Sequence, residues 1–141
     1  MLRVPKHVRI AAWRALLVLY VALILYLSSR PHLRPPVRFF LWDKFAHAGE
    51  YALLGFLSVQ ALADVPLGKG AKRTLLFLGM GILVAAVDEL IQAHVPGRES
   101  SILDLAADAL GLLIGIWLAR GAKAPEGNGE ERGNTEVGGM R

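Results

Sequence analysis

Ionisable residues interrupt an apolar sequence at two places, and their types and spacing suit ligand binding or acid–base chemistry. Asp43, His47 and Glu50 recur at i, i+4 and i+7, which places them on one face of a helix. Further along, "DELIQAHVPGRESSILDLAADALG" (residues 88–111) holds five acidic residues, an arginine, a histidine and a glutamine. A histidine beside carboxylates can act as a general base, and carboxylate oxygens are the ligands that Mg²⁺ and Ca²⁺ prefer. These two stretches are therefore the candidate functional site.

Four apolar segments must position these residues. They cover about residues 10–27, 45–63, 74–93 and 101–119, and each is close to the roughly 20 residues that cross a bilayer as a helix. Helix is the only plausible state, since four spans cannot close a barrel. Breaks containing proline separate the segments, and 54% of the chain is hydrophobic. The sequence therefore predicts an all-α bundle of four transmembrane helices.

Composition narrows the remaining possibilities. A single membrane domain is expected over residues 1–120, and residues 121–141, rich in glycine and charge, are expected to form a disordered cytoplasmic tail. The chain has no cysteine, which excludes disulfides, thiolate metal sites and cysteine nucleophiles. The net charge of +4 comes from short basic clusters between apolar runs rather than from a basic stripe, so no nucleic-acid partner is expected.

The distribution of lysine and arginine predicts the orientation in the membrane. With the N-terminus inside, eleven basic residues lie on the cytoplasmic side and five on the outer side, which predicts that both termini are cytoplasmic. The start of the second segment, the end of the third and the start of the fourth then lie together at the outer face.

The fourth segment carries its own polar stripe. Asp104, Asp108, Gly111 and Gly115 recur at i, i+4, i+7 and i+11. The two glycines form a small-xxx-small pair, which allows a neighbouring helix to approach closely. We therefore expect Gly111 and Gly115 to have a packing role directly below the two aspartates.

The third segment contributes Asp88, Glu89 and Gln92, which share about a third of their helix's circumference. A charge within the membrane costs something like 2.5–3.5 kcal/mol unless it is paired or hydrated, and this cost is lowest when the three polar faces meet. The prediction is a small acidic pocket at the outer face.

The same residues resemble three motifs of the VanZ-like family, over residues 27–115. The first motif, D-K-x-x-H-x-x-x-Y, is matched by Asp43, Lys44, His47 and Tyr51. The second, E-x-x-Q-x-x-x-P-G-R, is matched by Glu89, Gln92, Pro96, Gly97 and Arg98. The third is an Asp followed four residues later by a polar residue and then G-x-x-x-G, matched by Asp104, Asp108, Gly111 and Gly115. One departure is Asp108, where the family usually has Asn.

The resemblance implies a multi-pass protein of the bacterial cytoplasmic membrane. The founding member of the family is linked to low-level resistance to the lipoglycopeptide teicoplanin. The bilayer is the expected partner, with a lipid-linked cell-wall precursor or a lipoglycopeptide as the expected ligand. The oligomeric state is not predicted.

Three functions are consistent with these residues. The first is a non-catalytic envelope factor that binds an amphiphile through Lys44, Glu50, Tyr51, Glu89, Gln92, Arg98, Asp104 and Asp108. The second is an intramembrane enzyme in which His47 acts as base or nucleophile, oriented by Asp43 or Asp104, with Arg98 stabilising negative charge. The third is a proton-coupled transporter, which the lack of ionisable groups in the cytoplasmic half of the last two segments disfavours. No cofactor is required by the sequence, although Asp88, Glu89, Asp104 and Asp108 form a candidate set of ligands for a divalent cation.

Overall fold

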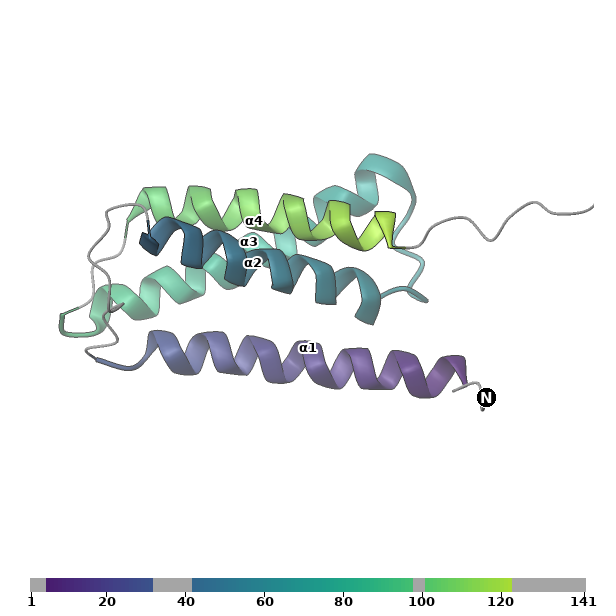
Figure 1. Cartoon of the computed structure of the whole chain (residues 1–141), viewed down its shortest axis with the longest axis horizontal. Helices are drawn as coiled ribbons and strands as arrows, with labels where there is room; N and C mark the ends of the chain where they lie inside the picture. Colours follow the sequence, from purple (N-terminus) through teal and green to yellow (C-terminus); the bar gives the residue numbers. More distant parts are fainter. Residues whose placement is uncertain (1–4, 32–41, 98–100, 123–141) are drawn as a thin grey trace, which may run out of the picture.

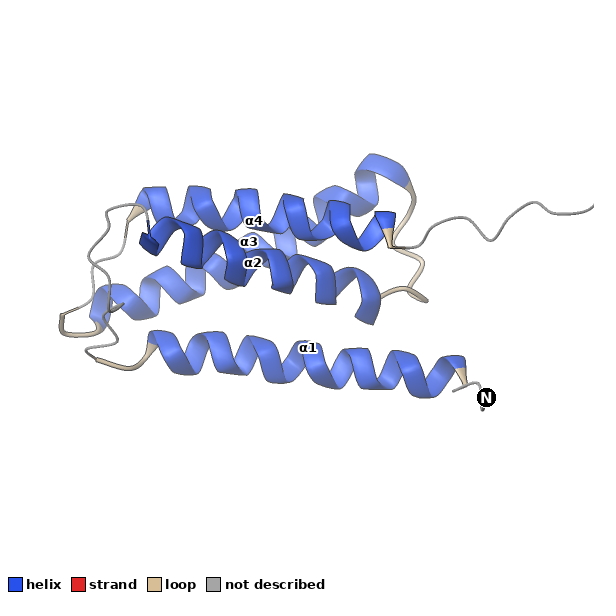
Figure 2. Cartoon of the chain, viewed as in Figure 1, coloured by secondary structure: helices blue, strands red, loops and turns tan. Residues whose placement is uncertain are grey.

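Four helices make up the fold in the computed structural model, which describes residues 5–31, 42–97 and 101–122. They are α1 (Lys6–Ser28), α2 (Trp42–Ala61), α3 (Gly70–His94) and α4 (Ile102–Gly121) (Figures 1 and 2). All regular structure in the described residues is helical, and each helix overlaps one predicted segment. The prediction of an all-α fold with four helices is confirmed. Arg98 and residues 123–141 of the predicted tail lie outside the described residues.

Consecutive helices run in opposite directions (Figure 1). The ends of α1 and α3 therefore lie at the same end of the bundle as the starts of α2 and α4. The described chain begins and ends at the opposite end of the bundle. Gly97 follows α3 with a φ of +81°, a left-handed conformation that favours glycine, and so starts the turn toward α4.

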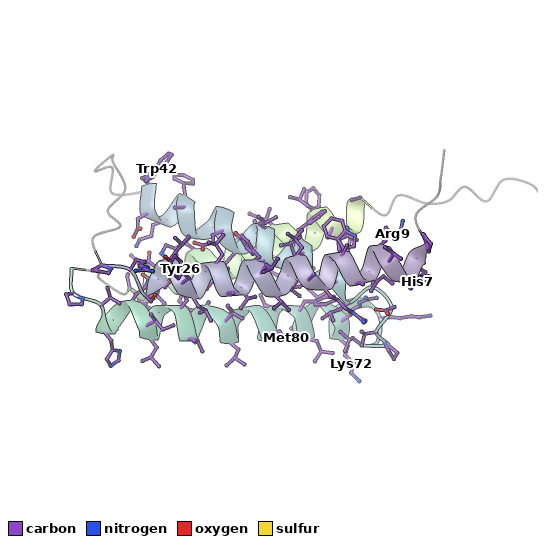
Figure 3. The ribbon with its side chains drawn as sticks, turned by 90° about the horizontal axis from the view of Figure 1, so that it is seen from below. His7, Arg9, Tyr26, Trp42, Lys72 and Met80 are labelled. Carbon is purple, nitrogen blue, oxygen red and sulfur yellow. The ribbon has the colours of Figure 1, made fainter. Side chains whose placement is uncertain are left out.

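Three of the helices are long and apolar enough to cross a membrane. These are α1, α3 and α4, with mean hydropathies of 2.2, 2.0 and 1.9 over their most apolar windows. Large apolar side chains cover their outward surfaces, and Met80 of α3 points away from the bundle (Figure 3). Such a surface is stable against lipid rather than water. The protein is therefore a multi-pass membrane protein.

The second helix differs from the predicted apolar span. α2 is not among the three membrane-length apolar helices, because Asp43, Lys44, His47 and Glu50 occupy its first half. It contacts all three other helices, and it packs most extensively against α4. Lys44 and His47 are thus accommodated by carboxylates of α4 rather than by lipid.

Two apolar clusters form the core of the bundle. Ile24, Tyr51, Leu54, Ala85 and Leu112 pack together from all four helices, in the half of the bundle nearer the end of α1. A second cluster lies closer to the end of α4 and contains Val59, Phe77, Ile116 and Ala119. The first cluster lies in the same half of the bundle as the buried polar residues Asp88, Asp104 and Asp108.

Candidate functional site

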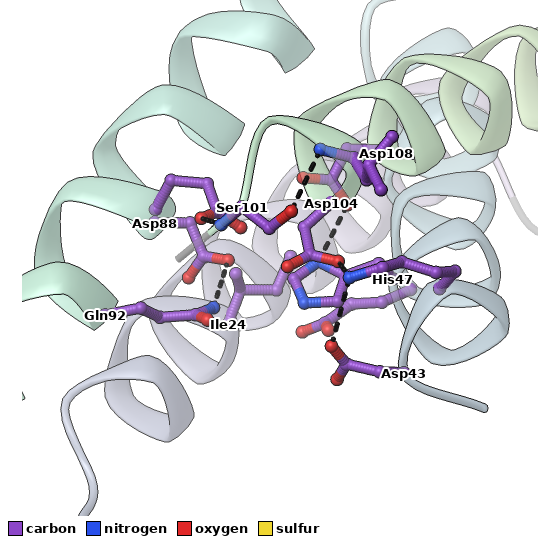
Figure 4. A network of polar contacts seen from close by, with 12 residues as sticks. Ile24, Asp43, His47, Asp88, Gln92, Ser101, Asp104 and Asp108 are labelled. Carbon is purple, nitrogen blue, oxygen red and sulfur yellow. Dashed lines mark hydrogen bonds and ion pairs between the residues drawn. The ribbon is translucent and has the colours of Figure 1, made fainter. Parts of the chain in front are cut away.

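Polar side chains from all four helices gather at the end of the bundle where α1 and α3 finish and α2 and α4 begin (Figure 4). Asp88, Asp104 and Asp108 are at most 1% exposed, and His47 is 6% exposed. We refer to this group as the polar cluster; it comprises Ser28, Asp43, Lys44, His47, Tyr51, Asp88, Glu89, Gln92, Asp104 and Asp108.

Two ionic contacts join α2 to α4 within the polar cluster. The Nδ1 atom of His47 lies 3.0 Å from Oδ1 of Asp108, a hydrogen-bond distance. One turn earlier on each helix, the Lys44 ammonium group donates to Oδ1 of Asp104 and lies 3.4 Å from Oδ2 of Asp43. Because Asp104 is almost fully buried, its charge depends on Lys44 for compensation.

Helix α3 is tied to α1 through Asp88. The Ser28 hydroxyl donates to Oδ1 of Asp88, and the Gln92 side-chain amide donates to Oδ2 at 3.0 Å (Figure 4). Ser28 is itself buried at the last turn of α1. Both oxygens of this carboxylate are therefore hydrogen-bonded, which suits Asp88 to a structural role.

Helix α3 is tied to α4 through Glu89. Its Oε2 atom accepts a hydrogen bond from the backbone N–H of Ser101 at 3.1 Å. The Ser101 side chain in turn caps α4 by accepting from the backbone N–H of Leu103 at 3.2 Å. The contact fixes the position of Glu89 beside the start of α4.

Glycines allow α2 and α4 to pack in direct backbone contact below the polar cluster. A Cβ atom added at Gly111 would lie 2.2 Å from the Ala48 carbonyl oxygen, and one at Gly115 would lie 1.8 Å from that of Ala52. Gly55 on α2 is similarly close to the Leu112 carbonyl oxygen, at 2.6 Å. No side chain larger than hydrogen fits at these positions without moving a helix.

Three buried oxygen atoms in the polar cluster make no hydrogen bond in the described part of the chain. They are the Tyr51 hydroxyl, Oε1 of Glu89 and Oδ2 of Asp108. Tyr51 and Asp108 are both 0% exposed. A buried oxygen without a partner costs about 1–3 kcal/mol, so these three atoms are candidates for contact with a water, a donor group or a cation.

Two groups of three side chains in the polar cluster bring candidate metal ligands close together. One is Asp43, His47 and Asp104, and the other is His47, Glu89 and Asp108; in each, the candidate ligand atoms lie within 4.8 Å of one another. The four carboxylates named from the sequence are therefore divided. Glu89 and Asp108 lie in one group and Asp104 in the other, while Asp88 belongs to neither.

A protein-family model described as VanZ/LLP1 matches residues 13–123, which include most of α1 and all of α2, α3 and α4. The chain belongs to the VanZ/LLP1 family. The resemblance found in the sequence is thus confirmed. Neither a curated protein nor a solved structure matches the chain. The function of this VanZ/LLP1 protein must therefore be argued from its own geometry.

The remaining predicted site residues of this VanZ/LLP1 protein are placed as follows. Glu50 is half-buried on α2, and its backbone carbonyl accepts a hydrogen bond from the Tyr20 hydroxyl at 3.0 Å. Asp43 is exposed at the start of α2. The hydrogen bond of His47 goes to Asp108 rather than to the expected Asp43 or Asp104, both of which contact Lys44.

Two features of the site were not anticipated from single stretches of sequence. Ser28 is not among the predicted site residues, although a hydroxyl in the last turn of an apolar helix is a signal for an inward hydrogen bond. The close approach at Gly55 had no signal of its own, since no second small residue lies four positions away on α2.

Proposed function

We propose that this VanZ/LLP1 protein is a cell-envelope factor whose polar cluster binds the polar headgroup of an amphiphile. The ligand is a lipid-linked cell-wall precursor or a lipoglycopeptide of the teicoplanin type. The observation that carries the proposal is Asp108, which is fully buried near the start of a membrane helix and has a carboxylate oxygen without a hydrogen bond among the described residues. Ionisable groups in such positions are costly to insert and generally serve a function.

The charges of the polar cluster favour the donor groups of the headgroup. Lys44 contacts Asp104 and Asp43, so its charge is already balanced by carboxylates of the protein. Glu89 and Asp108 have no Lys or Arg partner among the described residues, and each presents a carboxylate oxygen without a hydrogen bond. We therefore expect amino and hydroxyl groups of the headgroup to bind at Glu89, Asp108 and Tyr51. A phosphate group of the headgroup would bind Arg98.

The proposed location is the outer leaflet of the bacterial cytoplasmic membrane. Within the described residues, the end of the bundle opposite the polar cluster carries most of the basic residues, at positions 6, 9, 14, 69, 72, 73 and 120. Basic residues favour the cytoplasmic side, which orients the polar cluster outward.

Single-cysteine labelling tests this orientation, because the chain has no cysteine of its own. In intact cells, a membrane-impermeant maleimide should label the His94→Cys variant and leave the Gly121→Cys variant unlabelled until the cells are permeabilised. Both positions are exposed. The reverse labelling pattern would place the polar cluster in the cytoplasmic leaflet and contradict the proposal.

Antibiotic susceptibility tests the function in cells. His47→Ala and Arg98→Ala should each lower the minimum inhibitory concentration of teicoplanin to that of cells lacking the protein. His94→Ala is the matched control, since His94 is exposed and bonds only to the Leu90 carbonyl oxygen in the described structure. Protein abundance is measured by immunoblotting. If both site variants are present at normal abundance and susceptibility is unchanged, the polar cluster has no role in teicoplanin susceptibility.

An intramembrane enzyme is the second candidate function. The observation that favours it is the His47–Asp108 contact, because a carboxylate that orients a histidine and stabilises its charged form is typical of general bases. An enzyme would convert the bound amphiphile, and mass spectrometry of the amphiphile after incubation with purified protein would detect the product. Recovery of unmodified amphiphile would exclude this alternative for the amphiphile tested.

A further inference from the structure

We infer that His47, Glu89 and Asp108 form a binding site for a divalent transition-metal ion of the Zn²⁺ or Mn²⁺ type. The site uses the Glu89 and Asp108 carboxylates that the proposed headgroup would also contact, so the metal and the headgroup would compete for them, and each is tested without the other. The site differs from the all-carboxylate set expected from the sequence, because it takes a nitrogen ligand from α2 and excludes Asp88 and Asp104.

The first support is geometric. The three side chains come from α2, α3 and α4, and their candidate ligand atoms lie within 4.8 Å of one another. Ligand atoms bound at 2.0–2.2 Å around a tetrahedral Zn²⁺ are separated by roughly 3.3–3.6 Å. Small rotations of the side chains would bring these atoms to that separation.

The second support is the pair of carboxylate oxygens that the fold leaves without hydrogen bonds. The Asp108 side chain is fully buried; Oδ1 contacts His47, while Oδ2 makes no hydrogen bond within the described residues. Glu89 repeats the pattern, with Oε2 held by the Ser101 backbone and Oε1 without a partner. Glu89 is thus anchored through one oxygen by a group outside the candidate site and presents the other, which is the arrangement that outer hydrogen bonds give to metal ligands. Asp108 also presents an oxygen without a hydrogen bond, although its other oxygen contacts His47, itself a candidate ligand.

The third support is the balance of charge between the two candidate groups. The Asp43, His47 and Asp104 group already contains a cation, because Lys44 contacts both of its carboxylates. The Glu89 and Asp108 carboxylates have no Lys or Arg partner among the described residues. A metal ion that takes the place of the proton on His47 leaves this group with two negative charges, which a divalent ion would balance.

The ligand types determine the class of ion. One imidazole nitrogen with two carboxylates is a mixed nitrogen and oxygen set, which suits Zn²⁺ and Mn²⁺. Mg²⁺ and Ca²⁺ prefer oxygen ligands only, and Mg²⁺ retains several waters. We therefore expect Zn²⁺ and Mn²⁺ to bind in preference to Mg²⁺ and Ca²⁺.

Metal binding by the purified full-length protein tests the inference. The protein is reconstituted in lipid nanodiscs, stripped with a chelator and titrated separately with Zn²⁺, Mn²⁺, Mg²⁺ and Ca²⁺ by isothermal titration calorimetry. We expect one Zn²⁺ or Mn²⁺ ion per chain, and no saturation by Mg²⁺ or Ca²⁺ at the same concentrations. Loss of a direct ligand in Asp108→Asn or Glu89→Gln should weaken binding by more than about tenfold.

Asp104→Asn is the matched control, because it makes the same change four residues away on the same buried face of α4. It should change the affinity by less than about twofold, since Asp104 is held by Lys44 and is not a proposed ligand. Far-UV circular dichroism and gel filtration establish that each variant is folded. The unaltered protein gives a second readout that needs no variant. Bound Co²⁺ should show visible absorption, and one equivalent of Zn²⁺ should displace the Co²⁺ and abolish this absorption.

Three results would overturn the inference. They are the absence of stoichiometric Zn²⁺ or Mn²⁺ binding by the unaltered protein, an unchanged affinity in folded Asp108→Asn, and an equal loss in Asp104→Asn. None of these results bears on amphiphile binding, which is measured separately in metal-free protein.

Discussion

Gly115→Ala is expected to lower the free energy of unfolding by about 3 kcal/mol or more, because a backbone contact at this site leaves no room for a methyl group. The added Cβ would lie 1.8 Å from the Ala52 carbonyl oxygen and 2.9 Å from the Phe56 backbone nitrogen. Backbone atoms cannot rotate away as a flexible side chain can, so α2 and α4 must separate. The separation would also displace His47 from Asp108 one to two turns above.

Equilibrium unfolding in mixed micelles with increasing SDS, followed by circular dichroism, measures this change. Gly49→Ala is the control on α2, since nothing lies within 4 Å of a Cβ atom at that position. The free energy of unfolding of this variant should equal that of the unaltered protein or be higher by at most about 1 kcal/mol, because alanine favours the helix. Equal stability of the Gly115→Ala and Gly49→Ala variants would contradict the close packing of α2 against α4.

Lys44→Met is expected to destabilise the protein by about 2–3 kcal/mol, because it leaves a buried carboxylate without its cation. The side chain of Asp104 is 2% exposed and that of Lys44 is 22% exposed. Methionine retains much of the apolar stem of lysine, so the change removes mainly the charge and its hydrogen bonds. The same SDS titration measures the loss.

The Arg14–Asp64 ion pair at the other end of the bundle provides the matched control. Its side chains are 49% and 37% exposed, and the Arg14 guanidinium lies 2.8 Å from Asp64. Arg14→Met should cost less than about 1 kcal/mol, as is usual for exposed pairs. Combining Lys44→Met with Asp104→Asn should restore most of the lost stability. If the double variant were no more stable than Lys44→Met alone, Asp104 would not be the group that Lys44 compensates.

The apolar runs were sufficient to predict four helices. Their lengths and the proline-containing breaks are local properties, so each helix could be placed to within a few residues of its observed ends. The sequence overestimates the apolar character of α2, because its polar stripe at Asp43, His47 and Glu50 predicts only a local polar face on a lipid-facing span. In the structure, that stripe determines how the whole helix is packed between its neighbours.

The site was less accessible to sequence reasoning because helical periodicity gives the face of a residue but not its partner on another helix. The stripes correctly indicated that Asp104 and Asp108 share a face, and both are buried there. They did not indicate which of the two contacts His47, since that depends on the relative shift of α2 and α4 along their axes. The Ala48–Gly111 and Ala52–Gly115 contacts fix this shift. Contact between two helices is a tertiary property that one helix alone does not reveal.

The buried carboxylates of this VanZ/LLP1 protein fall into two classes. Asp88 and Asp104 are neutralised or hydrogen-bonded by side chains of the protein, through Ser28 and Gln92 in one case and Lys44 in the other. Asp108 and Glu89 each retain an oxygen without a partner in the described residues. We infer that the first class holds the helices together and that the second class is the functional part of the polar cluster.

Equilibrium binding of the headgroup ligand tests the central proposal most directly. Fluorescently labelled lipid-linked cell-wall precursor and teicoplanin are titrated separately with the protein in metal-free nanodiscs, and fluorescence anisotropy gives the dissociation constant. At least one of the two should bind saturably, one per chain, with an affinity reduced more than about tenfold in His47→Ala and unchanged in His94→Ala. Saturable binding of neither ligand, or equal affinities of His47→Ala and the unaltered protein, would contradict the assignment of the polar cluster as the ligand site.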